Sequence, residues 1–283
     1  MSFKLTHNAY GKSAVRLTKV VRHGGHHTLF EIDAAVQLEG DFAASYTAGD
    51  NRQVIATDTI KNTVYVVAKE NAFDSLEQFA VILCRHFLKT YPHVSAAKVE
   101  LQQAAWNRIA VDGTPHDHAF TGGGSHVRTC TAKLDRDHAE PEVIGGIEGL
   151  LVLKTTQSGW ADFHSDRYRT LKDTHDRILA SKVNATWTFN KTTADGNAAY
   201  DAINAAILKA FATTYSPSAQ KTIQDMGEAA LSACADIGSI SFTLPNLHRI
   251  PFNLDPFGLK FENDIFVATD EPHGLIHGTV SRG

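Results

Sequence analysis

Four polar side chains precede an apolar run in the segment IATDTIKNTVYVVAK, residues 55–69. Thr57 and Asp58 come first, and Lys61 and Asn62 follow. A threonine hydroxyl can pass on a proton, and a partly desolvated lysine gives up its own proton more easily than a lysine in water. These residue types indicate proton-transfer or nucleophilic chemistry.

A second group of chemically capable residues lies in the later half of the chain. Trp160 and Phe163 stand shortly before Arg177, and the sequence PNLH (245–248) follows an alternating segment. Functional side chains are often presented where a strand ends, which makes Asn246 and His248 candidates. Considered separately, Trp160 and Phe163 could be core aromatics and Arg177 a solvated cation. The PNLH segment could be a turn that contains a proline.

Two further motifs are weaker. HDH (116–118) places two histidines on one face of a strand, as a metal site requires, but no third ligand is evident nearby, so we expect no metal. The glycines at 122–124 follow no strand-to-helix phosphate pattern and predict a kink or bulge within a strand.

Composition restricts the classes of function. The 283 residues are 43% hydrophobic, enough for one large domain or two ordinary ones. The net charge is −4 and the basic residues are evenly spread, which argues against nucleic-acid binding. No apolar run reaches membrane-spanning length, no signal peptide or peroxisomal address is evident, and three cysteines lie far apart. We therefore expect no membrane partner and a bacterial-type cytoplasmic location.

The elements that must position these residues follow a regular order in residues 1–140. Alternating apolar residues predict strands at 12–22, 28–39, 94–109 and 117–133, joined in pairs by turns at HGGHH (23–27) and Asp112-Gly113. Apolar residues at helical spacing predict a helix over 58–69 and another from Asp74 to Pro92. Asp58 and Asp74 are the expected capping residues.

Residues 141–283 repeat this order less regularly. The predicted strands are 144–154, 183–190, 237–244 and 263–269, and the predicted helices are 196–215 and 217–236, the latter opening with Ser-Pro. A short helix near 170–180 would carry Arg177. The result is an α+β fold of two units, 1–140 and 141–283, each an antiparallel sheet with helices on one face. The bare sheet faces favour association of chains into a barrel or ring.

Taken together, the motifs resemble those of the urate oxidase (uricase) family. YGK, ATDTIKNT (56–63), the aromatic segment with Arg177, SAQ (218–220) and LPNLH (244–248) occur in the order and spacing typical of that family. The similarity extends from NAYGKSAVRLTKV to GLIHGTVSR, essentially the whole chain. It implies two tandem T-fold units per chain and a homotetramer around a β-barrel tunnel, with sites at subunit interfaces.

The resemblance also implies the chemistry. Urate would be oxidised by dioxygen and water to 5-hydroxyisourate and hydrogen peroxide, without metal or other cofactor. Lys12, Thr57 and His248 would form the catalytic hydrogen-bonded chain. The implied substrate-binding residues are Asp58, Trp160, Phe163, Arg177, Ala219, Gln220 and Asn246. Trp160 stands where the family usually has phenylalanine, so either Trp160 or Phe163 is the ring expected to stack on the purine.

Three other readings remain open. The Thr57–Lys12 pair could serve as nucleophile and base of a ring hydrolase. A pterin-type T-fold enzyme would need a histidine-bound zinc. A non-catalytic purine-binding protein would bind urate without consuming it.

Overall fold

The structure is a computed structural model that describes residues 3–192 and 194–283. The chain forms two compact units. The first comprises residues 1–146 and 188–199, and the second comprises 147–187 and 200–283. The predicted division into repeats at 140/141 stays a prediction, because a compact unit and a sequence repeat need not share their boundaries.

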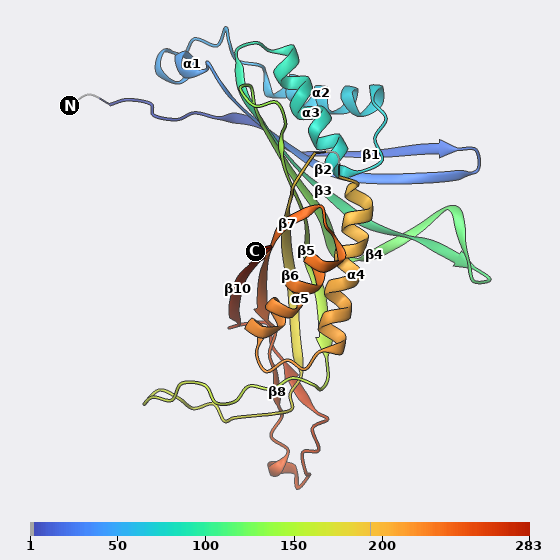
Figure 1. Cartoon of the computed structure of the whole chain (residues 1–283), viewed down its shortest axis with the longest axis vertical. Helices are drawn as coiled ribbons and strands as arrows, with labels where there is room; N and C mark the ends of the chain where they lie inside the picture. The colour runs from blue at the N-terminus through green and yellow to red at the C-terminus, as the bar shows by residue number, and fades with distance from the viewer. Residues whose placement is uncertain (1–2, 193) are drawn as a thin grey trace. The chain divides into compact units, whose positions relative to one another are not determined.

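Among the described residues, the first unit contains four complete, consecutive strands in the order β1-β2-β3-β4 and three complete helices. The strands are β1 (Tyr10–His23), β2 (His26–Gly40), β3 (Val94–Val111) and β4 (Thr114–Asp135), each antiparallel to its neighbour. The helices are α1 (Ala43–Ala48), α2 (Thr57–Glu70) and α3 (Leu76–Thr90). In Figure 1, α2 and α3 run over the strands of this unit; α2 packs on β1, and α3 packs on β3 and β4.

Alternation along the strands produces the core of this unit. Ile32, Ala34, Val36 and Leu38 of β2 are buried at every second position. The helices contribute buried residues at helical spacing to the same core, such as Ile60, Val64 and Val67 of α2. The predicted strands and helices of this half are confirmed.

Several local predictions in the first unit are wrong or incomplete. α1 was not predicted. The N-cap of α3 is Ser75 rather than Asp74: its hydroxyl accepts from the Gln78 backbone N–H at 3.2 Å, while the Gln78 side chain accepts from the Asp74 N–H at 2.9 Å. The predicted glycine kink is confirmed, since the β3–β4 register shifts opposite these glycines and Gly124 has φ +118°.

The second unit contains strands in the order β5-β6-β7-β10 together with a separate hairpin of β8 and β9. The sheet strands are β5 (Glu142–Lys154), β6 (Leu179–Phe189), β7 (Ile237–Asn246) and β10 (Gly274–Ser281); β5 and β6 each contribute a few residues to the first unit. The hairpin strands are β8 (Arg249–Pro251) and β9 (Phe266–Ala268), and the helices are α4 (Gly196–Thr213), the 3-10 turn η1 (Asp255–Phe257) and α5 (Ala219–Ala233). α5 packs against β7 and β10.

Three predictions for this half are corrected. The fourth sheet strand is β10, not 263–269, of which only the short β9 is extended. The predicted helix near 170–180 is absent from residues 155–178, all of which are described; Arg177 stands just before β6. The N-cap of α5 is Ser218, not the Ser-Pro pair before it, because the Ser218 hydroxyl accepts from the Lys221 N–H at 3.1 Å.

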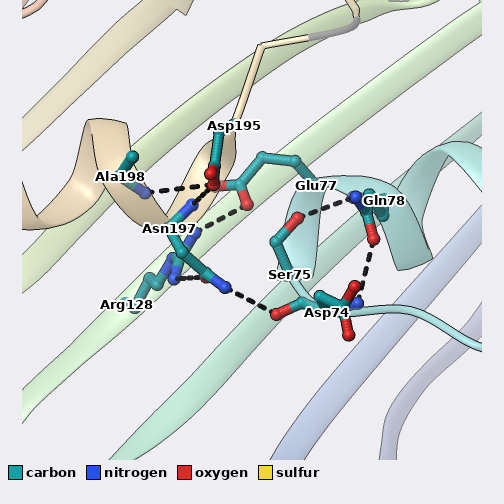
Figure 2. Close-up of polar contacts among 8 residues, drawn as sticks. All are labelled: Asp74, Ser75, Glu77, Gln78, Arg128, Asp195, Asn197 and Ala198. Carbon is teal, nitrogen blue, oxygen red and sulfur yellow. Dashed lines mark hydrogen bonds and ion pairs between the residues drawn. The ribbon is translucent and has the colours of Figure 1, made fainter.

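A buried ion pair ties three segments of the first unit together, as Figure 2 shows. Glu77 in the first turn of α3 accepts from Arg128 of β4 at 2.7 Å, and the two side chains are only 7% and 11% exposed. Arg128 also donates to the Asn197 side chain at 2.7 Å, and Asn197 donates to the Asp74 carbonyl at 2.7 Å. The start of α4 is thereby fixed to α3 and β4.

The described residues contain no helix long and apolar enough to cross a membrane. All three cysteines are buried free thiols, and burial raises the pKa of Cys84 to about 12. Assembly into a barrel stays a prediction.

Candidate active site

The first unit brings Lys12 close to the start of α2 through a tyrosine. The Tyr10 hydroxyl accepts a 2.7 Å hydrogen bond from the backbone N–H of Ile55, two residues before Thr57. Tyr10 begins β1, which also carries Lys12. This bond attaches the segment entering α2 to the strand that presents the lysine. The sequence showed Tyr10 only as part of a motif, and nothing in its periodicity indicated this role.

Gly11 and a bulge determine how Lys12 is presented. A Cβ at Gly11 would lie 1.8 Å from the carbonyl oxygen of Val36, so a larger residue cannot occupy this position without moving β2. The β1–β2 register shifts between Lys12 and Val15, and Ala14 adopts φ +56°. Bulges of this kind re-aim a side chain and are frequent next to active sites. Lys12 itself is half-buried.

Asp58 does not cap α2, contrary to the prediction, because the N-cap position is Ala56 and no side chain caps it. Asp58 lies inside the first turn, where its carboxylate accepts from Lys61 and, at 3.0 Å, from Asn62. The hydrogen bond and charge of Lys61 lower the pKa of Asp58, with smaller contributions from Asn62 and the more distant charge of Lys12. Lys12 and Asp58 are therefore within electrostatic reach of one another.

The four polar residues of segment 55–69 thus differ in their contacts. Lys61 and Asn62 hold the Asp58 carboxylate, and Thr57 is exposed at the first position of the helix. Among the described residues no hydrogen bond joins the Thr57 hydroxyl to Lys12, so the proton relay between them stays a prediction.

The second unit holds a cavity of about 510 Å³ whose walls include four predicted site residues, Trp160, Arg177, Asn246 and His248. Its other walls come from the 170–178 segment and from the β8–β9 hairpin, such as Ile250 and Phe266. The sequence analysis did not predict these hairpin residues as part of a site, because strands of three residues leave almost no periodic pattern that would place them beside Arg177.

Arg177 is one of three basic residues that line this cavity, together with Lys172 and Arg249. Its backbone N–H donates to the Ser158 carbonyl at 2.8 Å, which anchors the residue just before β6. Burial lowers the pKa of Arg177 from its ordinary value, with the nearby Tyr215 acting in the opposite direction. Within the described part of the chain its Nε is buried with no hydrogen-bond partner. A desolvated guanidinium with unused donor capacity suits a planar anion.

The two candidate stacking rings differ in what they face. Trp160 lines the cavity, and its backbone exchanges two hydrogen bonds with Thr174, at 2.7 and 2.9 Å. Phe163 is not among the lining residues but stacks on Trp160, with ring centroids 5.3 Å apart and planes 15° from parallel. This arrangement favours Trp160 as the ring that meets a ligand.

The ends of three elements converge near Asn246. Asn246 closes β7, and the next residue, Leu247, donates to the Ala180 carbonyl of β6 at 2.8 Å. A small hollow beside the main cavity is lined by Asn246, Ala219 and neighbours. Ala219 and the exposed Gln220 open α5, where first-turn N–H groups have no partner within the helix. The structure thus places Ala219 beside Asn246; Gln220 is adjacent but not among the cavity walls.

The sequence matches the family model described as Uricase over residues 8–133 and 143–277. The uricase of Arthrobacter globiformis is 42% identical over 278 residues, covering 98% of this chain and 90% of that protein. The chain belongs to the uricase family. The uricase of Dictyostelium discoideum is 37% identical, with 98% and 97% of the two chains covered.

Solved structures of uricases agree with this assignment. The crystal structure of the Arthrobacter globiformis uricase superposes with a TM-score of 0.94 at 41% identity, covering 100% of this chain and 96% of that one. A urate oxidase from Bacillus sp. TB-90 superposes with a TM-score of 0.83 at 20% identity, covering 97% and 100%, which shows a shared fold. The predicted α+β fold and the predicted family are confirmed.

In this uricase-family chain the HDH motif of β4 contacts the start of β2. The rings of His116 and His118 are 4.5 Å apart, and the intervening Asp117 pairs with His26 at 2.9 Å. The described residues contain no group of three or more His, Cys, Asp or Glu side chains arranged to hold a metal ion. The predicted roles of the individual site residues remain predictions.

Proposed function

We propose that the protein is a urate oxidase, converting urate, dioxygen and water to 5-hydroxyisourate and hydrogen peroxide. The observation that supports this most directly is the cavity where the Arg177 guanidinium, the Trp160 ring, Asn246 and His248 meet. Urate is a flat anion with donors and acceptors around its edge. A cation, a stacking face and polar groups at the wall match each of those properties.

Each residue then has a defined task. Arg177 forks onto one edge of the purine; a charge-assisted hydrogen bond contributes roughly 1.5–3 kcal/mol. Gln220 and the Ala219 N–H bind the opposite edge, and Trp160 covers a face, where stacking contributes about 1–3 kcal/mol. Asn246 faces the position of dioxygen or water above the ring.

The chemistry needs the substrate itself as reductant. Lys12, acting through the Thr57 hydroxyl with His248 continuing the chain of hydrogen bonds, removes a further proton from bound urate. The electron-rich anion gives one electron to dioxygen, and the radical pair combines to form a carbon–oxygen bond. The peroxide leaves as hydrogen peroxide while water adds to the ring, which balances atoms and electrons. We propose no cofactor for this sequence of steps.

We further propose that the site is shared by two copies of the chain within a homotetramer. Lys12, Thr57 and Asp58 would come from one copy, and Arg177, Gln220, Asn246 and His248 from its neighbour. The similarity to uricases over nearly the whole chain supports this arrangement. A cytoplasmic location belongs to the same proposal and can be tested by cell fractionation.

Incubation with urate in air, on protein first treated with chelator, tests the function. We expect the ultraviolet band of urate to disappear with one peroxide formed per urate. Turnover that persists without oxygen and yields no peroxide would instead indicate a ring hydrolase. Binding without loss of the band would indicate a non-catalytic protein. Activity that disappears with the chelator and returns with zinc would indicate a pterin-type enzyme.

A further inference from the structure

Four side chains of the second unit form one stacked series beside the cavity. The Trp160 and Phe163 rings lie nearly parallel with centroids 5.3 Å apart. The Arg169 guanidinium carbon lies 4.1 Å from the Phe163 centroid, and that of Arg177 lies 5.8 Å from the Trp160 centroid. Only Trp160 and Arg177 of these four line the cavity, so the series leads away from it through Phe163 to Arg169.

Arg169 is fixed rather than solvated. Its Nη2 donates to the Asp173 carboxylate at 2.7 Å and its Nε donates to the Leu171 carbonyl at 3.1 Å. The side chain is 25% exposed. A guanidinium held by two acceptors presents its flat face in one orientation, which is the geometry that stacking on an aromatic ring requires.

The Trp160 ring needs such support because of where it stands. Residues 161–173 form no regular helix or strand, so the local backbone does not fix the rings within this stretch. The backbone bonds to Thr174 fix the Trp160 main chain but leave its side-chain torsions to packing. A ring that must be ordered on binding loses rotamer entropy, which weakens affinity.

We propose that Arg169 and Phe163 are positioning residues that hold the Trp160 indole at the cavity wall, ready to stack on a planar anionic purine. The inference rests on the proposed function and deepens it. Phe163 is thereby removed as a direct contact of the substrate, since its ring is occupied by Trp160 and Arg169. The effect should fall on substrate affinity and little on the chemical step.

The variant Arg169→Gln tests this against a matched control. Arg167→Gln removes the same charge from the same segment, where Arg167 lies over Tyr168 and not over Phe163. Loss of a partly exposed cation–π contact predicts a rise of about two- to fivefold in KM for urate in R169Q, with kcat nearly unchanged. R169K keeps the charge without the planar fork and should lie between. R167Q should match the wild type.

A substrate-free measurement separates this inference from the proposed function. The chain has three tryptophans, so protein labelled with 5-fluorotryptophan gives three fluorine resonances, assigned by W160F. R169Q should shift or broaden the Trp160 resonance alone, leaving those of Trp106 and Trp187 as references. If the wild type fails to oxidise urate, the proposed function fails while this test still stands.

A double-mutant cycle decides whether Arg169 acts through Phe163. F163L alone should raise KM, and adding R169Q to it should have almost no further effect. Fully additive changes in KM, an unchanged Trp160 resonance in R169Q, or an equal effect of R167Q would each overturn the proposal.

Discussion

At the scale of single residues, Thr57 is an exposed hydroxyl at the first position of a helix, and Lys12 is a half-buried amine presented by a bulge. If the two pass a proton from urate, Thr57→Ala and Lys12→Ala should each lower kcat by about 10²–10⁴-fold, the range for general acid–base catalysis. KM should change far less. Steady-state kinetics of urate consumption provide the measurement. Thr57→Ser keeps the hydroxyl and should retain most activity; alanine variants with full turnover would end the relay assignment.

The charge on Asp58 gives a prediction about pH. The hydrogen bond from Lys61 is the largest cause that lowers the Asp58 pKa below its ordinary 3.8. Lys61→Gln should raise that pKa toward 3.8, so the variant loses the carboxylate charge at a higher pH than the wild type. A carbon NMR titration of the Asp58 carboxyl measures this. Lys69→Gln, in the last turn of the same helix, is the control. Identical titrations in K61Q and wild type would contradict the assignment.

At the scale of elements, periodicity predicts those parts whose pattern is local. The β1–β2 hairpin and helices α2 and α3 follow from alternating or helical spacing of apolar residues. The alternating pattern does not predict β10, because two glycines interrupt it. One of them, Gly278, lies close to a residue far away in the chain: a Cβ there would lie 2.9 Å from the Ile223 side chain of α5.

The same limit applies to the site. The segment RTLKDTHDRIL (169–179) contains apolar residues near helical spacing. It forms no helix, because the backbone of Thr174 is hydrogen-bonded to Trp160 and that of Arg177 to Ser158. The motifs predicted Arg177, Asn246 and His248 as site residues, and these three line one cavity. The Tyr10 hydrogen bond, the β8–β9 wall and the contact of Arg169 with Phe163 involve residues that are far apart in the chain or lie outside any periodic pattern. Such contacts leave no signature in a single sequence.

The buried Glu77–Arg128 pair carries a prediction about elements. Removing one member leaves an uncompensated buried charge, so Arg128→Met should lower the free energy of unfolding by about 3–5 kcal/mol. Arg85→Met breaks an exposed pair, with Arg85 and Glu140 53% and 61% exposed, and should cost under about 1 kcal/mol. Chemical denaturation of both variants provides the comparison. Replacing Glu77 and Arg128 together by methionine should lower the free energy of unfolding less than R128M alone. Equal losses in R128M and R85M would show that the buried pair does not stabilise the fold more than an exposed pair.

At the scale of the whole molecule, the proposed sharing of one site by two copies makes a prediction that a single-chain site does not make. Lys12→Ala and Arg177→Gln should each be almost inactive. When the two variants are co-expressed with different tags and the mixed assembly is purified, some sites receive Lys12 from the R177Q chain and Arg177 from the K12A chain. Random mixing should restore about a quarter of wild-type activity, because each residue is intact in half of the chains. Mixed assemblies that contain both tags and remain inactive would place Lys12 and Arg177 in a site made by one chain, because only then does every site carry one of the two substitutions.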